Sequence, residues 1–116
     1  MSEVQAFNEY RSRMNERILS GNSKIIKRIF NLDSNTYQDG ALDKKTKELA
    51  GLSASMVLRC DDCIRYHIQS GLEAGATEAE LVEIFEIALL VGGTIVIPHL
   101  RRAYAYMDEL LNESGS

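Results

Sequence analysis

Residues 77–93 read TEAELVEIFEIALLVGG, and this stretch decides the fold class. Thr77 and Glu80 stand at the spacing of a capping box, a motif that starts helices. Apolar residues then recur every three to four positions, which is the period of an α-helix. The pair Gly92-Gly93 interrupts the pattern. The stretch therefore predicts an amphipathic helix with defined ends.

Past Ala88 the same segment is apolar on every side, since it continues Leu89-Leu90-Val91. A helix that is apolar all round is buried on several sides. A chain of 116 residues buries only about two-thirds of its unfolded surface as a monomer. We therefore expect a homo-oligomer in which this segment contacts another subunit.

The rest of the chain has the same helical period. The other predicted helices run from Val4 to Ile18, from a Ser23 cap to Phe30, from Asp43 to a break at Arg59–Asp61, from Cys63 to Leu72, and from Pro98 to Leu111. Residues 31–40 are polar and predict a loop or a short helical turn, and residues 112–116 predict a frayed tail. No segment has the pattern of a strand. The expectation is one all-α domain over residues 1–116, with five or six helices.

Composition and charge exclude several classes of protein. Hydrophobic residues make up 45% and charged residues 26%, which is typical of a globular domain rather than a disordered chain. The net charge of −4 argues against binding to nucleic acid. The charge is uneven: residues 1–30 carry six basic and three acidic side chains, and residues 71–100 carry five acidic and no basic ones. This pattern predicts complementary helix surfaces or a subunit interface.

The N-terminal sequence MSEVQAFNEY has neither the basic nor the apolar region of a signal peptide. The longest apolar stretch, Ile84 to Pro98, is shorter than a membrane span. These features predict a cytoplasmic protein without a membrane partner. Two cysteines in that compartment stay reduced as a rule, so a purely structural disulfide is not the first interpretation.

The strongest chemical signal is Cys60-Asp61-Asp62-Cys63, followed by Ile64-Arg65-Tyr66-His67. The segment holds both cysteines and one of the two histidines of the chain. Cys63 and His67 are neighbours on a helix because they stand at i and i+4. The two cysteines are one turn apart at a helix start, a geometry that permits a reducible disulfide.

Two opposing effects act on a thiol in this position. The helix N-terminus favours the thiolate, and a nearby imidazole can take the thiol proton. The carboxylates of Asp61 and Asp62 disfavour a neighbouring thiolate. The sequence leaves open which effect wins.

A base such as His67 needs a third group that orients it, and Glu48 is the candidate. A helical hairpin about Arg59 would bring the two side chains together. Considered by itself, Glu48 is expected to be a solvated helix carboxylate, because Glu is seldom fully buried.

Other interpretations of the motif compete with a redox role. The cysteines could be two small core residues. A zinc site could use Cys60, Cys63 and His67, with a fourth ligand from Glu48, Asp62 or His99. Zinc would need Cys60 off the helix, because about 10 Å separates it from His67 along a continuous helix. A thioredoxin fold is excluded, since its strands are absent. The sequence contains no phosphate-binding loop and no dinucleotide-binding motif, so it gives no indication of an organic cofactor.

A second cluster lies at the start of the last predicted helix. His99 is expected to be structural or interfacial. Arg101 and Arg102 could bind an anionic substrate or pair with the acidic helix of a neighbouring subunit.

Glu48, eleven intervening residues, then Cys60-x-x-Cys63-x-x-x-His67 resembles the alkyl hydroperoxidase D-like members of the carboxymuconolactone decarboxylase family. The segment from Gly92 to Ala103 resembles a later segment of the small members. The resemblance covers about residues 40–110.

The resemblance implies an all-helical fold that assembles into trimers or hexamers. It implies a peroxidase that uses Cys60 and Cys63 as a redox pair, with Glu48 and His67 as a proton relay to Cys63. No cofactor is implied, and the partners would be a peroxide and a dithiol or peroxiredoxin-type redox protein.

In one place the sequence departs from the family pattern. Some members carry a histidine directly before the second cysteine, where this chain has Asp62. The electron donor therefore stays open, and so does the cysteine that meets peroxide first: helix position favours Cys60, and the His67 contact favours Cys63. Two alternatives remain, a decarboxylase-type lyase, whose known examples lack the paired cysteines, and a non-catalytic redox-sensing or metal-binding module.

Overall fold

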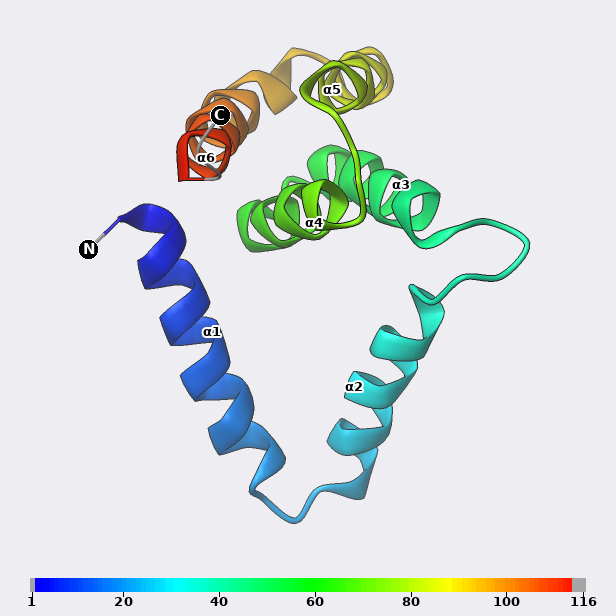
Figure 1. The fold of residues 1–116 in the computed structure, drawn as a ribbon, viewed down its shortest axis with the longest axis vertical. Coiled ribbons are helices and arrows are strands. Elements are labelled where there is room, and N and C mark those ends of the chain that lie inside the picture. The colour runs from blue at the N-terminus through cyan, green and yellow to red at the C-terminus, as the bar shows by residue number, and fades with distance from the viewer. Residues whose placement is uncertain (1, 114–116) are drawn as a thin grey trace. The chain divides into compact units, whose positions relative to one another are not determined.

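The computed structural model describes residues 2–113, and every regular element in this part of the chain is helical (Figure 1). The elements are α1 (Glu3–Leu19), α2 (Lys24–Thr36), α3 (Lys44–Val57), α4 (Asp61–Glu73), α5 (Glu78–Gly92), the 3₁₀ helix η1 (Thr94–Val96) and α6 (Ile97–Glu113). The predicted all-α class is confirmed.

The chain divides into two units after Gln38. The first unit contains α1 and α2. A capping box of Ser2 and Gln5 starts α1, and Ser23 caps α2 through a bond to the Ile26 N–H. Both helices therefore begin where short polar side chains satisfy backbone donors that have no partner inside the helix.

The prediction for residues 31–40 was wrong in its first half, because α2 continues to Thr36. Leu32 stands three positions after Ile29, so the helical period extends into this polar stretch. The Thr36 hydroxyl donates to the Leu32 carbonyl at 2.7 Å and closes the last turn. At the other end of the chain, α6 extends through Glu113, which corrects the predicted start of the tail at residue 112; residues 114–116 lie outside the described residues.

The second unit, from Asp39 onward, holds a packed core formed by α3 to α6. Helix α3 packs against α4 and α5, and α4 packs against α6 (Figure 1). The fully buried apolar side chains here include Leu52, Met56, Ile64, Ile68, Leu81, Phe85, Tyr106 and Met107. Polar bonds join the same helices: Lys45 of α3 pairs with Glu80 of α5 at 2.9 Å, and the Tyr106 hydroxyl donates to Gln69 at 3.0 Å. The α3–α4 pair is thus bonded to α5 through α3 and to α6 through α4.

The capping box predicted at Thr77 and Glu80 is present at the start of α5. The predicted break at Gly92-Gly93 is confirmed as well, since α5 ends at Gly92 and Gly93 has φ 84°. This left-handed backbone conformation favours glycine, which has no Cβ. The turn starts η1 and directs the chain into α6. No helix between residues 2 and 113 has the length and apolar character that crossing a membrane requires.

Candidate active site

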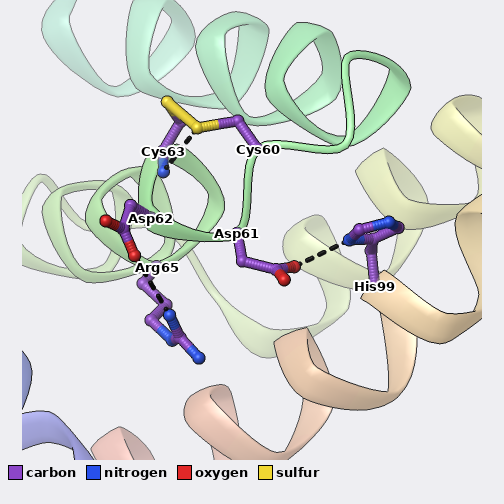
Figure 2. The surroundings of a disulfide bond; sticks show 6 residues. All are labelled: Cys60, Asp61, Asp62, Cys63, Arg65 and His99. Atoms are coloured by element: carbon purple, nitrogen blue, oxygen red, sulfur yellow. Dashed lines mark hydrogen bonds and ion pairs between the residues drawn. A yellow bond between two sulfur atoms is a disulfide. The ribbon is translucent and has the colours of Figure 1, made fainter.

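Cys60 and Cys63 are joined by a disulfide at the start of α4, with their Cα atoms 5.3 Å apart (Figure 2). Cys60 is the N-cap residue, and its Sγ accepts a hydrogen bond from the Cys63 N–H at 3.3 Å. Cys60 is half-buried and Cys63 is exposed. Both sulfurs therefore lie at the positive end of the helix dipole, where a thiolate formed by reduction is stabilised.

The end of α3 places Cys60 in this position. The Cys60 N–H donates to the Ser55 carbonyl, and the Arg59 N–H donates to the Met56 carbonyl, both at 3.0 Å. Arg59 has φ 60°. These bonds and the left-handed residue are a Schellman motif, which closes a helix. One residue thus ends the closing motif of α3 and caps α4, so the break predicted at Arg59–Asp61 is confirmed.

Glu48 and His67 form a buried pair that joins α3 to α4. The distance from Glu48 Oε1 to His67 Nδ1 is 2.8 Å. Glu48 is 0% exposed and His67 is 7% exposed. The expectation of a solvated Glu48 was therefore wrong. Packing of α3 on α4 buries this position, and partners for the carboxylate make its burial possible.

Lys44 is the other partner of Glu48, and this contact was not predicted from the sequence. Its Nζ donates to Glu48 Oε2 at 3.1 Å from one turn earlier on α3. The i, i+4 spacing of Lys44 and Glu48 was the signal that could have revealed it. Both oxygens of the buried carboxylate are therefore engaged, one by an imidazole and one by an ammonium group.

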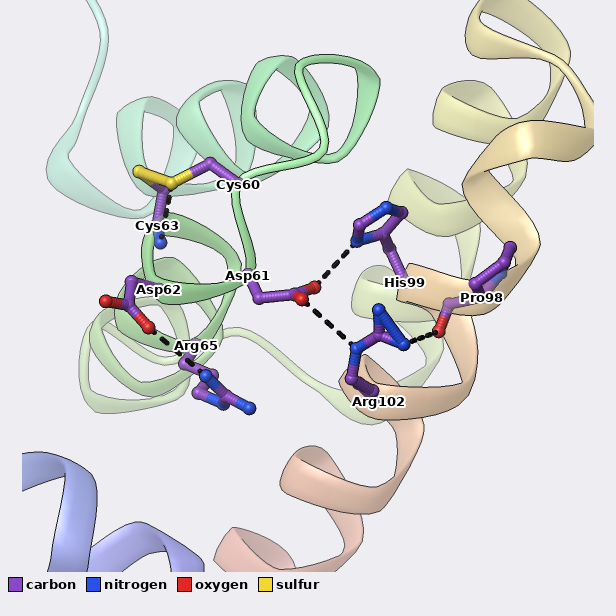
Figure 3. Close-up of polar contacts among 8 residues, drawn as sticks. All are labelled: Cys60, Asp61, Asp62, Cys63, Arg65, Pro98, His99 and Arg102. Atoms are coloured by element: carbon purple, nitrogen blue, oxygen red, sulfur yellow. Dashed lines mark hydrogen bonds and ion pairs between the residues drawn. A yellow bond between two sulfur atoms is a disulfide. The ribbon is translucent and has the colours of Figure 1, made fainter.

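Asp61 turns away from the disulfide toward α6, as Figures 2 and 3 show. Its carboxylate bonds His99 Nδ1 at 2.7 Å and accepts from Arg102 Nε at 3.1 Å. Arg102 also donates to the Pro98 carbonyl at 3.3 Å. Partial burial acts to raise the pKa of the Asp61 carboxyl, but the hydrogen bonds and charges of His99 and Arg102 outweigh it, so its pKa lies below the ordinary value.

Asp62 has a cationic partner too, since Arg65 donates to it at 3.2 Å (Figure 2). Each carboxylate between the cysteines is thus paired with a positive side chain. These pairs reduce the repulsion that the carboxylates would exert on a thiolate. Arg65 and Arg102 therefore weaken the effect by which Asp61 and Asp62 disfavour a thiolate, one of the two opposing effects that the sequence left open.

The structure brings the four predicted catalytic side chains to the α3–α4 hairpin. His99 and Arg102 have intramolecular partners, whereas Arg101 is exposed on α6. Among residues 2–113 no group of three or more histidine, cysteine or acidic side chains has the arrangement of a metal site.

The fold and the site define an all-helical protein with a C-x-x-C disulfide beside a buried Glu–His pair. Comparison with known sequences identifies the family. The chain belongs to the carboxymuconolactone decarboxylase family, which it matches over residues 24–106. The family resemblance inferred from the sequence is thereby confirmed.

Two similar sequences come from bacteria. An uncharacterized protein of the cox locus of Paracoccus denitrificans is 32% identical over 74 residues, which are 64% of this chain and 67% of that protein. An uncharacterized protein of Cupriavidus necator is 34% identical over 73 residues, covering 63% of this chain and 65% of its own length. The match thus spans about two-thirds of these relatives.

Solved structures resemble the chain over nearly all of its length. A crystal structure of a Thermotoga maritima protein is 53% identical, with a TM-score of 0.92 over 96% of this chain and 97% of that one. A second structure from Thermotoga maritima is described as a member of this family for which a role in the antioxidative response has been suggested. The apo form of a Legionella pneumophila family member is 25% identical, with a TM-score of 0.84 over 94% and 97% of the two chains.

Proposed function

We propose that this protein is a thiol-dependent peroxidase that cycles between a Cys60–Cys63 disulfide and a dithiol. The observation that carries the proposal is the position of this disulfide one helical turn from the buried Glu48–His67 pair. A cysteine beside an oriented base is an activated nucleophile. The role suggested for the Thermotoga maritima relative points in the same direction.

The reaction begins with the reduced protein and a peroxide ROOH. His67 takes the proton of the Cys63 thiol, and the thiolate attacks the terminal peroxide oxygen. An S–O bond forms, the O–O bond breaks, and the alkoxide takes the proton from His67 and leaves as ROH. The Cys60 thiol then attacks the sulfenic acid, an S–S bond forms, and water leaves. Two electrons pass from the two thiols to the peroxide.

We assign the attacking thiol to Cys63 because it is exposed, whereas Cys60 is half-buried. Glu48 holds the imidazole at Nδ1, so proton exchange with the thiol takes place through Nε2, directly or through water. An external dithiol reopens the disulfide by exchange and is oxidised in turn. A reducing compartment such as the cytoplasm supplies such donors.

The test is peroxide consumption by the protein with dihydrolipoamide as the donor. We expect turnover by the wild type and loss of turnover in both Cys60→Ser and Cys63→Ser. Cys60→Ser should still form a sulfenic acid at Cys63, which dimedone traps, whereas Cys63→Ser should not. His67→Ala should lower the rate about a hundredfold while the helical circular dichroism signal stays.

Absence of turnover in fully reduced, metal-free wild type would contradict the proposal for that donor. The lyase alternative predicts a different result, which is release of carbon dioxide from a carboxymuconolactone with both thiols blocked. A non-catalytic redox module predicts a disulfide that forms once with peroxide and is not turned over.

We also propose that the protein assembles with copies of itself. Helix α2 exposes Ile25, Ile29 and Leu32, and the end of α5 exposes Leu90 and Val91. The same two helices carry opposite charges, since basic residues lie on α2 (Lys24, Lys27 and Arg28) and acidic residues lie on α5 (Glu83 and Glu86). Light scattering should show an oligomer for the wild type, and Leu90→Glu should shift it toward the monomer.

A further inference from the structure

Glu48 is completely buried, and the structure engages each of its carboxylate oxygens with a different group. His67 bonds Oε1 at 2.8 Å, and Lys44 bonds Oε2 at 3.1 Å. Lys44 is the first residue of α3, and its side chain is 42% exposed. Its ammonium group therefore reaches from the surface to an atom that solvent does not reach.

An ionised carboxylate is costly to bury unless a positive charge or hydrogen bonds stabilise it. His67 supplies a positive charge only while it is protonated. The proposed reaction needs His67 neutral when it takes the thiol proton. At that moment Lys44 is the cation that the structure places on Glu48. From α5, the Glu80 carboxylate does not compete for this cation, because it is paired with Lys45.

The charge on Glu48 decides which nitrogen of neutral His67 carries the proton. An ionised carboxylate only accepts hydrogen bonds, so His67 must then hold its proton on Nδ1 and has a lone pair on Nε2. A protonated Glu48 would donate to Nδ1 instead. The imidazole proton would then lie on Nε2, and this nitrogen could not take a proton from a thiol.

We propose that Lys44 is a positioning residue, which keeps Glu48 ionised and thereby holds neutral His67 in the tautomer that acts as a base. Its effect on tautomer follows from the contacts of Glu48. Its effect on rate rests on the proposed peroxidase function. Lys44 touches neither substrate nor sulfur in this account and acts only through Glu48.

The experiment compares Lys44→Gln with Lys44→Arg in the full-length reduced protein. Lys45→Gln is the matched control. It removes the same charge from the neighbouring residue, which pairs with Glu80 and not with Glu48. The ¹⁵N chemical shifts of His67 report the tautomer without any peroxide present. Stopped-flow oxidation of the thiols by hydrogen peroxide gives the rate as a function of pH.

We expect the wild type, Lys44→Arg and Lys45→Gln to show the proton of neutral His67 on Nδ1. Lys44→Gln should move the proton of neutral His67 to Nε2. It should also lower the rate of thiol oxidation at neutral pH roughly tenfold and change the dependence of that rate on pH. Lys44→Met, which keeps the apolar stem, should behave as Lys44→Gln does and checks the result in a second background.

Unchanged ¹⁵N shifts and an unchanged pH profile in Lys44→Gln would overturn the inference. Failure of the proposed function gives a different result, because wild type would then lack peroxide turnover while the tautomer still depended on Lys44. A rate loss of equal size in Lys45→Gln would also overturn the inference, since it would show a general effect of charge.

Discussion

Asp61 Oδ1 lies 2.7 Å from His99 Nδ1, although the two residues are 38 positions apart in the chain. The bond joins the start of α4, where the disulfide lies, to the start of α6 (Figure 3). Arg102 adds a second contact to the same carboxylate at 3.1 Å. The position of the C-x-x-C turn is therefore coupled to the last helix as well as to the α3–α4 hairpin.

The first prediction concerns acid stability. The pKa of Asp61 is lower in the folded protein than the ordinary value, because the bonds from His99 and Arg102 outweigh its partial burial. The ionised group therefore stabilises the folded state above the unfolded-state pKa, near 4, and this contribution is lost as pH falls through the folded pKa. Asp61→Asn should lower the free energy of unfolding at pH 7 by about 1–3 kcal/mol.

Urea unfolding between pH 2.5 and 7 measures this effect. The difference between wild type and Asp61→Asn should shrink as the pH falls below about 4. Asp43 and Glu80 also have a lowered pKa, each mainly because the carboxylate accepts a side-chain hydrogen bond, from Thr46 in the first case and from Lys45 in the second. Their effects are common to both proteins and cancel. A difference independent of pH would contradict the assignment.

The second prediction concerns thiol reactivity. Arg102 partly neutralises the Asp61 carboxylate next to Cys60. Its removal leaves more negative charge near the sulfurs and makes a thiolate less favourable. Arg102→Ala should therefore slow alkylation of the reduced protein by iodoacetamide at pH 7, by roughly twofold to fivefold, since the pair is partly exposed.

Arg101→Ala is the control for this measurement, because it removes the same charge from an exposed position on the same helix. Equal slowing in both variants would show that total charge, rather than the pair with Asp61, sets the reactivity. Loss of peroxide turnover in Arg101→Ala with unchanged alkylation would support the substrate role that the sequence permitted for this residue.

The helices could be predicted from local signals. Short polar caps at Ser23, Asp43 and Thr77 and the glycine at Gly93 stand at the boundaries that the structure shows. These signals act within one turn of a helix, so the residues that form them are close together in the sequence. The end of α2 was missed because its polar composition hid a helical period that continued through Leu32.

The site depended on contacts that sequence spacing does not encode. The spacing of Cys63 and His67 follows from one helix, because both residues lie on α4. The burial of Glu48 and the bond between Asp61 and His99 follow from packing between helices. The contact between Lys44 and Glu48 combines both kinds of information. Its i, i+4 spacing is visible in the sequence, but its importance depends on the burial of Glu48, which is not.

The third prediction concerns the buried carboxylate. Glu48→Ala removes the acceptor of His67 and leaves space in the core between α3 and α4. It should lower the free energy of unfolding by about 3–5 kcal/mol, the usual cost of removing one partner of a buried charged pair. Glu48→Gln keeps the volume and should cost less, about 1–3 kcal/mol.

Thermal or urea unfolding of the two variants measures these costs, and thiol oxidation by peroxide measures the function. If Glu48 orients His67, Glu48→Gln should slow oxidation about a hundredfold at a modest loss of stability. An oxidation rate equal to the wild type in a folded Glu48→Gln protein would leave Glu48 a structural residue only.

The fourth prediction separates two glycines of the second unit. Gly93 has φ 84°, so a Cβ would strain the turn after α5 even though no atom lies within 4 Å of it. Gly93→Ala should therefore lower the free energy of unfolding by about 1–2 kcal/mol. Gly71 lies inside α4, and its Cβ would meet Ala76 at 3.9 Å and Leu81 at 4.0 Å, which are ordinary contacts.

Gly71→Ala should raise the free energy of unfolding by about 0.5–1 kcal/mol, because alanine loses less backbone entropy in a helix than glycine does. Urea unfolding at neutral pH measures both variants against the wild type. The two substitutions add the same methyl group, so opposite signs of the two changes would separate the strained glycine from the helical one. Destabilisation by Gly71→Ala as large as that by Gly93→Ala would mean that α4 packs more tightly against the start of α5 than these distances show.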